Sequence, residues 1–463
     1  MTAGCARYGS HVSRQVTEQA SPPSGRGLPL VGHLPWFYAD TNGFLLRLAR
    51  SQGDIASFWL GREQAFLLSH PEDVQRVLVE DADAFRKGRL MQRARRLLGD
   101  GLLTSEGELH RRQRRRLQPA FCRHQLVSYG ETVPRFAARL ADRWTQGETV
   151  NVSAAMDELA MAIIVQTLLG ADIEREAAPL ASDLRVLARW LPLLAAPMAR
   201  RLERAGVPPF RRAGQAADRI DAAVRRCIAE AVPSKSRDLL SLLLSPGADG
   251  VPMPPRLARD EAMTLFLAGH DTTAAALTWT WHLLATHPDV DRRLQGELDE
   301  VLVDRDPVPA DCPSLAFTGM LLDEALRLYP PVGRIGRRPL EDYRIGGRLI
   351  PAGAAVFVSP FVTQRDPRWW PEPDRFDPDR WTDEARRRRP RYAAFPFGAG
   401  PRSCIGEHMA RMIGILAIAT IARHWRMVSP PGAPAPRIRS ILTLKPKHPL
   451  HLLLERRSGP VAD

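Results

Sequence analysis

A ten-residue segment near the C-terminal end constrains this chain more than any other part of its sequence. It runs from Phe397 to Gly406 and reads Phe-Gly-Ala-Gly-Pro-Arg-Ser-Cys-Ile-Gly. Its three glycines, at 398, 400 and 406, allow positive φ angles and a close approach of other groups to the backbone. Residues Glu407 to Arg423 have a helical pattern, so Cys404 would lie near a helix N-terminus, which favours the thiolate. A glycine-rich turn around a buried free cysteine is the alternative interpretation.

A second motif lies inside the longest predicted helix, which follows a loop rich in proline and glycine between Ser245 and Pro255. The motif is Ala268-Gly269-His270-Asp271-Thr272-Thr273, and apolar residues flank it. Glycine and hydroxyl residues are poor choices for a helix interior. They suit a helix that opens locally, because threonine side chains bond to carbonyls of the preceding turn and bend it. A polar kink or an N-cap is the alternative interpretation of these six residues.

The composition indicates a globular chain and excludes several other classes of protein. Of its 463 residues, 44% are apolar and 25% are charged. The net charge of +13 comes almost entirely from arginine, and because no nucleic-acid-binding motif accompanies it we expect no nucleic-acid partner. The five scattered cysteines indicate neither a disulfide framework nor a zinc site, and they fit a reducing cytoplasm. No stretch of about 20 apolar residues is present, so we expect no membrane span.

Hydrophobic periodicity predicts a mainly α fold with small β-sheets. Residues 1–21 have the composition of a flexible N-terminal tail, and we expect one domain over residues 22–463. Apolar residues recur at three- and four-residue spacing over most of His110 to Leu244, which is typical of helices. Leu97 to Thr104 is expected to be a glycine-containing loop. Strand patterns occur in three segments: Ile55 to Ser69, Tyr343 to Val358, and Ser440 to Leu454.

Five positions of the glycine-rich segment match the pattern F-x-x-G-x-R-x-C-x-G, and the long helix matches A-G-x-D/E-T. On these motifs the chain resembles the cytochrome P-450 family over about residues 22 to 456. The resemblance implies a fold shaped like a triangular prism, with haem b between the long central helix and the helix after the cysteine. It implies that Cys404 is the axial thiolate ligand of the haem iron, which favours O–O cleavage. Phe397, Arg402 and Gly406 would surround the cofactor, with Arg402 at a propionate.

The same resemblance assigns the acid and the alcohol of the long helix to catalysis. Asp271 and Thr272 would relay protons to bound dioxygen, because O–O cleavage in a dry pocket consumes protons. An alcohol can orient a water molecule there, and an acid can supply the proton.

A supporting motif is the pair Glu324 and Arg327, whose i, i+3 spacing places both on one helix face. They match the family pattern E-x-x-R. The third member of this family constellation is an arginine in a P-x-R-F segment, here Arg375. The resemblance implies that the three residues form a buried hydrogen-bonded network that supports the haem loop.

Further arginines are candidates for the acid groups of the cofactor or for a partner protein. His110 and Arg114 match the family pattern H-x-x-x-R, which contacts the haem propionates, and Arg337 matches a further propionate ligand, with Arg338 as the alternative. Two clusters of arginine form either a solvated surface or a docking face for an acidic ferredoxin. The first cluster is Arg111, Arg112, Arg115 and Arg116, and the second is Arg386 to Arg389.

In the family, several dispersed segments line the substrate pocket. They correspond here to Arg89 to Leu103, Leu180 to Met198, Met263 to Thr272, Val332 to Ile335, and Ile441-Leu442. Most of these residues are apolar, which suits a hydrophobic small molecule, although ordinary core packing is the alternative for each. The pocket candidates are Phe266, Ala268, Val332, Arg334 and Leu442. As the charged member, Arg334 would bind either a carboxylate or polar group of the substrate, or a haem propionate or solvent.

The function implied by the resemblance is that of a monooxygenase that activates O2 and hydroxylates or epoxidises a hydrophobic small molecule. A terpenoid or polyketide-like substrate in bacterial secondary metabolism is expected. The chain has no flavin or iron–sulfur motif, so electrons would come from a ferredoxin and a ferredoxin reductase. We expect a cytoplasmic monomer. The alternative is a haem-thiolate carrier or ligand-binding protein without turnover.

Overall fold

The computed structural model describes residues 27–169, 182–183, 186–187, 199–230, 239–246, 250–440 and 442–457. The predicted tail of residues 1–21, most of the segment 180–198 and Ile441 therefore lie outside the described residues.

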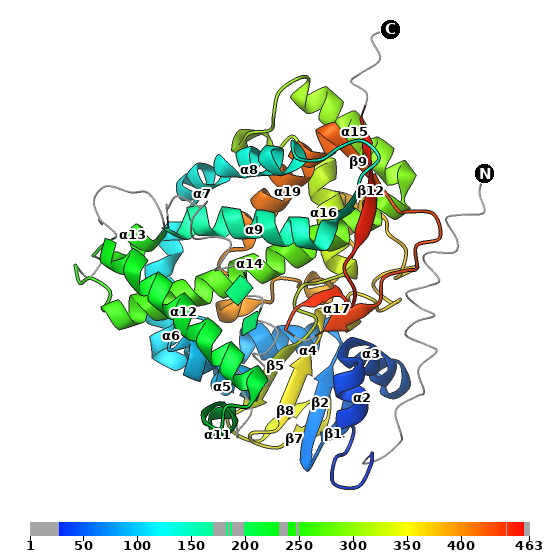
Figure 1. Ribbon diagram of the computed structural model, residues 1–463. Helices are drawn as coiled ribbons and strands as arrows, with labels where there is room; N and C mark the ends of the chain where they lie inside the picture. The colour runs from blue at the N-terminus through cyan, green and yellow to red at the C-terminus, as the bar shows by residue number, and fades with distance from the viewer. Residues whose placement is uncertain are drawn as a thin grey trace.

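Helices make up most of the described chain, as the periodicity predicted. Figure 1 shows α14 crossing the middle of the helical body, with α9 beside it and α12 crossing in front. The helices are α2 (Leu34–Ala39), α3 (Thr41–Gln52), α4 (Pro71–Gln75), α5 (Arg89–Leu98), α6 (Gly107–Leu117), α7 (Arg123–Gly130), α8 (Thr132–Ala141), α9 (Val152–Leu169), α11 (Ala199–Arg204), α12 (Pro208–Glu230), α13 (Leu239–Leu244), α14 (Pro255–Thr286), α15 (Pro288–Leu302), α16 (Ala316–Leu328), α17 (Pro360–Thr363), α18 (Asp383–Arg387) and α19 (Glu407–His424).

The strands form small sheets, of which the largest lies at the lower right of Figure 1 beside α2 and α3. This five-stranded sheet has the order β1-β2-β8-β5-β3, and the others have the orders β4-β12-β9, β10-β11 and β6-β7. The strands are β1 (Ile55–Leu60), β2 (Glu63–Leu68), β3 (Phe85–Lys87), β4 (Thr149–Asn151), β5 (Ile335–Pro339), β6 (Tyr343–Ile345), β7 (Arg348–Ile350), β8 (Ala355–Val358), β9 (Trp425–Val428), β10 (Ile438–Ser440), β11 (Leu444–Pro446) and β12 (His451–Arg456).

The predicted hairpin is confirmed, because β1 and β2 pair antiparallel with Ile55 opposite Leu68. The structure differs from the local expectations in two details. The expected loop begins only after Leu98, because α5 extends to that residue. The predicted helical run also contains the short strand β4, which pairs with β12 so that Asn151 lies opposite His451. This partner lies 300 residues away along the chain, so no local sequence pattern indicates the pairing.

None of the described helices is both long enough and apolar enough to cross a membrane.

The close contact between α9 and α14 sets the position of the central motif. Helix α14 is continuous from Pro255 to Thr286, so the opening expected around Gly269 is not seen in the helix assignment. A side-chain carbon built on Gly269 would lie 2.7 Å from the Cδ1 atom of Ile164 on α9. Gly269 is therefore closely packed against α9, and a bulkier residue there would have to displace the Ile164 side chain.

Replacing Gly269 by valine should lower the free energy of unfolding by about 1–3 kcal/mol, because the added methyl groups overpack this contact. Gly296 on α15 is the matched control, since a side-chain carbon there has open space around it. We expect Gly296→Val to leave the unfolding transition close to that of the unmodified protein. Equal losses in both variants, measured by denaturant titration, would contradict this explanation of Gly269.

Candidate functional site

The cysteine loop is held in shape by its backbone. The N–H of Cys404 donates to the carbonyl of Phe397 at 2.8 Å, which closes the loop. Gly398 and Gly400 have φ angles of +73° and +69°, and the carbonyl of Leu78 occupies the space where a Gly400 side chain would begin. These two glycines behave as predicted.

Gly406 differs from the other two glycines of the loop. Its φ angle is −92°, which any residue adopts, so the freedom to take a positive φ is not used there. Gly406 instead precedes α19, and its N–H donates to the sulfur of Cys404.

The Cys404 side chain is accessible although protein surrounds it on most sides, so it faces an internal opening. Burial raises the pKa of its thiol, whereas the Gly406 N–H and the charge of Arg114 act in the opposite direction. Arg114 on α6 also fixes the loop, because it donates to the carbonyl of Ser403 at 2.6 Å. A thiolate at this position needs a stronger positive partner than these, and the iron of a haem fits that requirement.

Four cations gather around His110, which is buried in α6. After burial itself, the charges of Lys87, Arg402, Arg114 and Arg337 lower the pKa of His110, to about 3, so the imidazole is neutral. Two carboxylates, Glu106 and Glu261, act on Lys87 in the opposite sense. Burial lowers the pKa of Lys87 to about 7, so this lysine is only partly charged at neutral pH, but the three arginines alone outnumber the two carboxylates. Buried unbalanced charge is costly, and a cofactor with two carboxylates, as haem b has, would fit this excess of positive charge.

The arginine of β5 that joins this cluster is Arg337. Arg337 is 8% exposed, and burial lowers its pKa to about 10. Arg338 points to the other face of the strand, where its guanidinium bonds to Glu63 and to the carbonyl of Gly353. The geometry therefore favours Arg337 over its neighbour as the candidate propionate ligand.

Arg402 and Lys87 are the remaining cations of the cluster. Arg402 donates to Glu106 at 2.9 Å and to the Phe85 carbonyl at 2.8 Å, so protein acceptors already engage it. Lys87 lies at the end of β3 and donates to the carbonyls of Leu102 and Ser105 at 2.9 and 2.7 Å. Sequence reasoning missed Lys87, because one lysine in a short strand looks like a surface residue until the strand is placed.

The Glu324–Arg327 pair is confirmed as a fully buried ion pair on α16. The guanidinium contacts the carboxylate with two parallel bonds of 2.8 Å, and both side chains have no exposed area. Arg327 also donates to the carbonyls of Gln364 and Pro373 at 2.9 and 2.6 Å. The Gln364 side chain in turn accepts from the N–H of Phe395, two residues before the cysteine loop begins. The pair thereby supports the approach to the loop.

The expected third member of this network, Arg375, does not contribute its side chain to the Glu324 carboxylate. Its guanidinium pairs with Glu372 at 3.0 Å and is 63% exposed, while its carbonyl accepts from Arg327 at 3.0 Å. Arg380 occupies the expected place, 3.5 Å from Glu324, and the indole N–H of Trp381 donates to the same carboxylate at 2.8 Å. The P-x-R-F motif identified the correct segment, but the guanidinium beside Glu324 belongs to Arg380 and not to Arg375.

Replacing Arg327 by methionine should lower the free energy of unfolding by about 3–5 kcal/mol, because it leaves the Glu324 carboxylate buried without its partner. Arg375→Met is the control and should change stability by no more than about 0.5 kcal/mol, as is usual at an exposed position. Both values can be measured by denaturant titration. A similar loss of unfolding free energy in the two variants would indicate that the Arg375 side chain belongs to the network.

On the opposite side of the site, Asp271 is buried in α14 and tied to the β11 region. Lys445 lies 2.6 Å from its carboxylate, and the Thr443 hydroxyl donates to it at 2.5 Å. Lys445 also contacts Asp157 of α9 at 3.0 Å. Burial acts to raise the pKa of Asp271, but Lys445 and Thr443 outweigh it and hold the pKa below its usual value. Sequence reasoning missed both partners, because they lie about 170 residues from Asp271.

Thr272 lies next to Asp271 in sequence but faces a different environment. Its hydroxyl donates to the carbonyl of Ala268 at 2.6 Å, one turn earlier. Ala268 is exposed and Thr272 is partly exposed, although α14 runs through the middle of the fold. These two positions share a helix face, so this face borders an internal opening.

Replacing Lys445 by methionine leaves Asp157 and Asp271 without their shared cation, and we expect a loss of about 3–5 kcal/mol of unfolding free energy at pH 8. The pKa of Asp271 should then rise above its unfolded value. Protonation of Asp271 therefore relieves the loss as the pH falls from 8 to 5. Denaturant titrations at both pH values, with the exposed Lys447→Met as control, test this expectation. An equal loss at the two pH values would contradict it.

The structure separates the substrate-pocket candidates into two groups. Phe266 has no exposed area and packs in an apolar cluster with other core residues, so its assignment to the pocket surface was wrong. It lies on the other side of α14 from Ala268. Val332 is 37% exposed and Leu442 is partly buried. Their segments lie side by side, because the N–H of Leu444 donates to the carbonyl of Pro331 at 2.9 Å.

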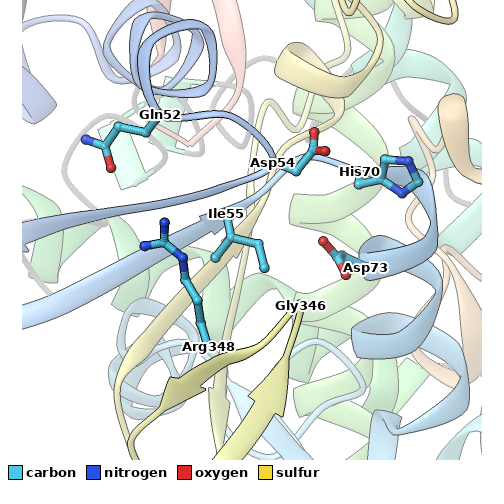
Figure 2. A pocket seen from close by; sticks show the side chains of 7 residues that line it. All are labelled: Gln52, Asp54, Ile55, His70, Asp73, Gly346 and Arg348. Carbon is cyan, nitrogen blue, oxygen red and sulfur yellow. The ribbon is translucent and has the colours of Figure 1, made fainter.

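A separate recess of about 450 Å³ lies at the surface between α3, β1, α4 and the β6–β7 turn. Figure 2 shows Ile55 near its centre, with Asp73 and His70 on one side and Arg348 on the other. The Asp54 carboxylate on its rim is paired with Arg368. No group of three or more metal-ligating side chains suited to a metal ion occurs among the described residues. None of the predicted site residues is among those that line this recess, so it is separate from the candidate site.

Comparisons with known proteins agree with this geometry. A family model described as Cytochrome P-450 matches residues 22–453. The chain is 36% identical to cyclooctatin synthase of Streptomyces melanosporofaciens, over 91% of this chain and 93% of that protein. It is 32% identical to pentalenene oxygenase of Streptomyces avermitilis, over 92% and 95% of the two chains. The solved structure of a retinoic acid-bound cyanobacterial cytochrome P-450 has a TM-score of 0.85 at 24% identity, covering 94% of this chain and 99% of that one.

The fold and the matched sequence define a haem-dependent monooxygenase. The chain belongs to the cytochrome P-450 family, and its cofactor is haem b.

Proposed function

We propose that Cys404 is the haem ligand and that the enzyme oxidises a terpenoid in bacterial secondary metabolism. The accessible Cys404 sulfur beside an excess of buried cations carries the proposal, because it suits an iron centre with two acid groups. The terpenoid assignment rests on relatives named cyclooctat-9-en-7-ol 5-monooxygenase and pentalenene oxygenase, the first 34% identical to this chain. Ala268, Val332 and Leu442 give the pocket small and apolar walls that suit such a molecule.

In this proposal His110, Arg114 and Arg337, with Lys87, hold the propionates, and Arg402 braces their surroundings through Glu106. Bound haem supplies dioxygen activation and oxygen-atom transfer. Around it, the Thr272 hydroxyl orients a water molecule, and Asp271 one residue away relays protons, its carboxylate taking each proton from solvent before passing it on. Lys445 and Thr443 keep Asp271 ionised and in place between deliveries. Hydroxylation and epoxidation are both open to such a site.

The proposed electron donors are a ferredoxin and its reductase, which meet the outer side of the cysteine loop. A recess of about 120 Å³ there is lined by Phe397, Gly398 and Arg411, among others. The basic residues near this side are partly neutralised, because Arg111 and Arg115 contact Glu108 and Arg386 contacts Asp323. The remaining positive charge suits an acidic partner.

Residues 22–463 are proposed to form a single domain that acts as a cytoplasmic monomer. The uninterrupted family match over residues 22–453 supports one domain. The described cysteines Cys122, Cys312 and Cys404 are free thiols, which suits a reducing compartment.

The spectrum of the reduced protein with carbon monoxide tests the ligand. We expect a strongly red-shifted Soret band in the unmodified protein, its loss in Cys404→Ser, and its retention in the control Cys122→Ser, whose cysteine is exposed elsewhere. A band at the ordinary haem position in all three proteins would reject Cys404 as ligand.

Turnover separates the enzyme from a carrier without turnover. Pentalenene and cyclooctat-9-en-7-ol are suitable first substrates for a reconstituted ferredoxin system. Substrate-dependent reductant consumption with an oxygenated product supports the proposal. Tight binding of these compounds without any oxygenated product would favour the carrier.

A further inference from the structure

Arg334 is a cation held inside the fold with little to bind it. It lies between α16 and β5, and protein surrounds it although part of its side chain remains accessible. Its guanidinium is 3.5 Å from the Ser440 hydroxyl and lies 5.5 Å from the ring centre of Phe37. Burial lowers its pKa to about 10. Within the described part of the chain, no carboxylate forms an ion pair with it. A guanidinium has five N–H donors, so most of them are available.

Other buried arginines of this protein are matched much better. Arg327 makes two bonds to Glu324 and donates to three carbonyls. Arg365, also without exposed area, lies 3.5 Å from the carboxylate of Asp374 and donates to the carbonyl of Leu328. Burial of a charge is costly without such partners. The environment of Arg334 therefore lacks an anion that the other two sites contain.

The backbone that carries Arg334 is fixed. The carbonyl of Gly333 accepts from the Ser359 hydroxyl at 2.7 Å, and the carbonyl of Pro331 accepts from the Leu444 N–H at 2.9 Å. Two of the segments predicted to line the substrate pocket, those of Val332 and Leu442, therefore lie side by side here. Arg334 adds a positive group to an otherwise apolar wall.

Arg334 is separate from the cations proposed to hold the haem propionates. Lys87, Arg114, Arg337 and Arg402 act together on His110, and Arg402 also acts on Arg337. None of them contributes to the shift at Arg334, where Tyr38 is the ionisable group that acts. Arg334 therefore belongs to a different electrostatic environment from that cluster, and a ligand other than a propionate held there can supply its anion.

We propose that Arg334 binds a carboxylate of the substrate, so that the enzyme acts on terpenoid acids at a carbon distant from the acid group. This inference rests on the proposed function and narrows its substrate class. A carboxylate matches a guanidinium with two parallel bonds and also cancels its charge, whereas a hydroxyl offers one neutral acceptor. Ser440 lies at the position to assist as a donor to the same group.

Imidazole probes test this anchor without knowledge of the substrate. We suggest ω-(imidazol-1-yl)alkanoic acids of increasing chain length, each compared with its methyl ester. Imidazole binds the haem iron and gives a nitrogen-ligand spectral shift, while the tail reaches along the pocket. At the chain length that spans the distance to Arg334, we expect the acid to bind at least about tenfold more tightly than its ester, as for a charge-assisted bond.

The variants identify the residue responsible. Arg334→Leu should abolish the preference for the acid, and Arg334→Lys should retain part of it because the charge remains. Arg344→Leu is the matched control, since Arg344 is an exposed arginine on β6. The carbon monoxide spectrum of each variant verifies its haem site. Equal affinities for acid and ester at every chain length, or an unchanged preference in Arg334→Leu, would reject the anchor.

Two further outcomes can be distinguished from binding of a substrate carboxylate at Arg334. Loss of haem from Arg334→Leu, measured as the haem-to-protein ratio, with no difference between acid and ester would assign Arg334 to the cofactor and overturn the proposal. If neither acid nor ester gives a spectral shift in the unmodified protein, the haem site itself fails, and the proposed function fails with it.

Discussion

The buried ion pair between Glu324 and Arg327 is the interaction on which the rest of the site depends. It joins α16 to the segment before the cysteine loop, because Arg327 donates to the carbonyls of Gln364 and Pro373. The side-chain oxygen of Gln364 accepts a hydrogen bond from the N–H of Phe395 at 3.0 Å, which fixes the backbone just before the loop. A charge pair without exposed area is costly to form and more costly to break. The loop that presents Cys404 is thus positioned by a core interaction that does not touch the sulfur.

Charge placement divides the site into distinct environments. Around His110 the fold gathers more positive than negative groups, which prepares it for an anionic cofactor. Across the site, Asp271 is balanced by Lys445, so an acid can stay ionised in a buried position. Residues at the facing ends of β10 and β11 connect this acid to Arg334, because Ser440 contacts Arg334 and Thr443 contacts Asp271. The two proposed roles, substrate binding at Arg334 and proton delivery at Asp271, would therefore share one structural element.

Sequence reasoning succeeded where a local pattern carried the chemistry. The cysteine loop, the helix after it, the i, i+3 ion pair and the central helix all appear where they were predicted. Sequence reasoning failed where the position of a residue was correct but the direction of its side chain was not. Arg375 lies in the expected segment yet faces Glu372, and Phe266 lies on the core side of α14. Gly269 was expected to open the helix locally, whereas in the structure it packs against Ile164 of α9.

The sequence by itself determined the chemistry available to this protein: a cysteine before a helix, an acid beside an alcohol, and a family pattern that spans the chain. Local periodicity and short motifs suffice for these features, because the residues involved are neighbours along the backbone. The tertiary structure alone decided their partners. Lys87, Arg380, Thr443 and Lys445 reach the site from distant segments. Such contacts depend on how whole helices and strands pack, and no local spacing encodes that arrangement.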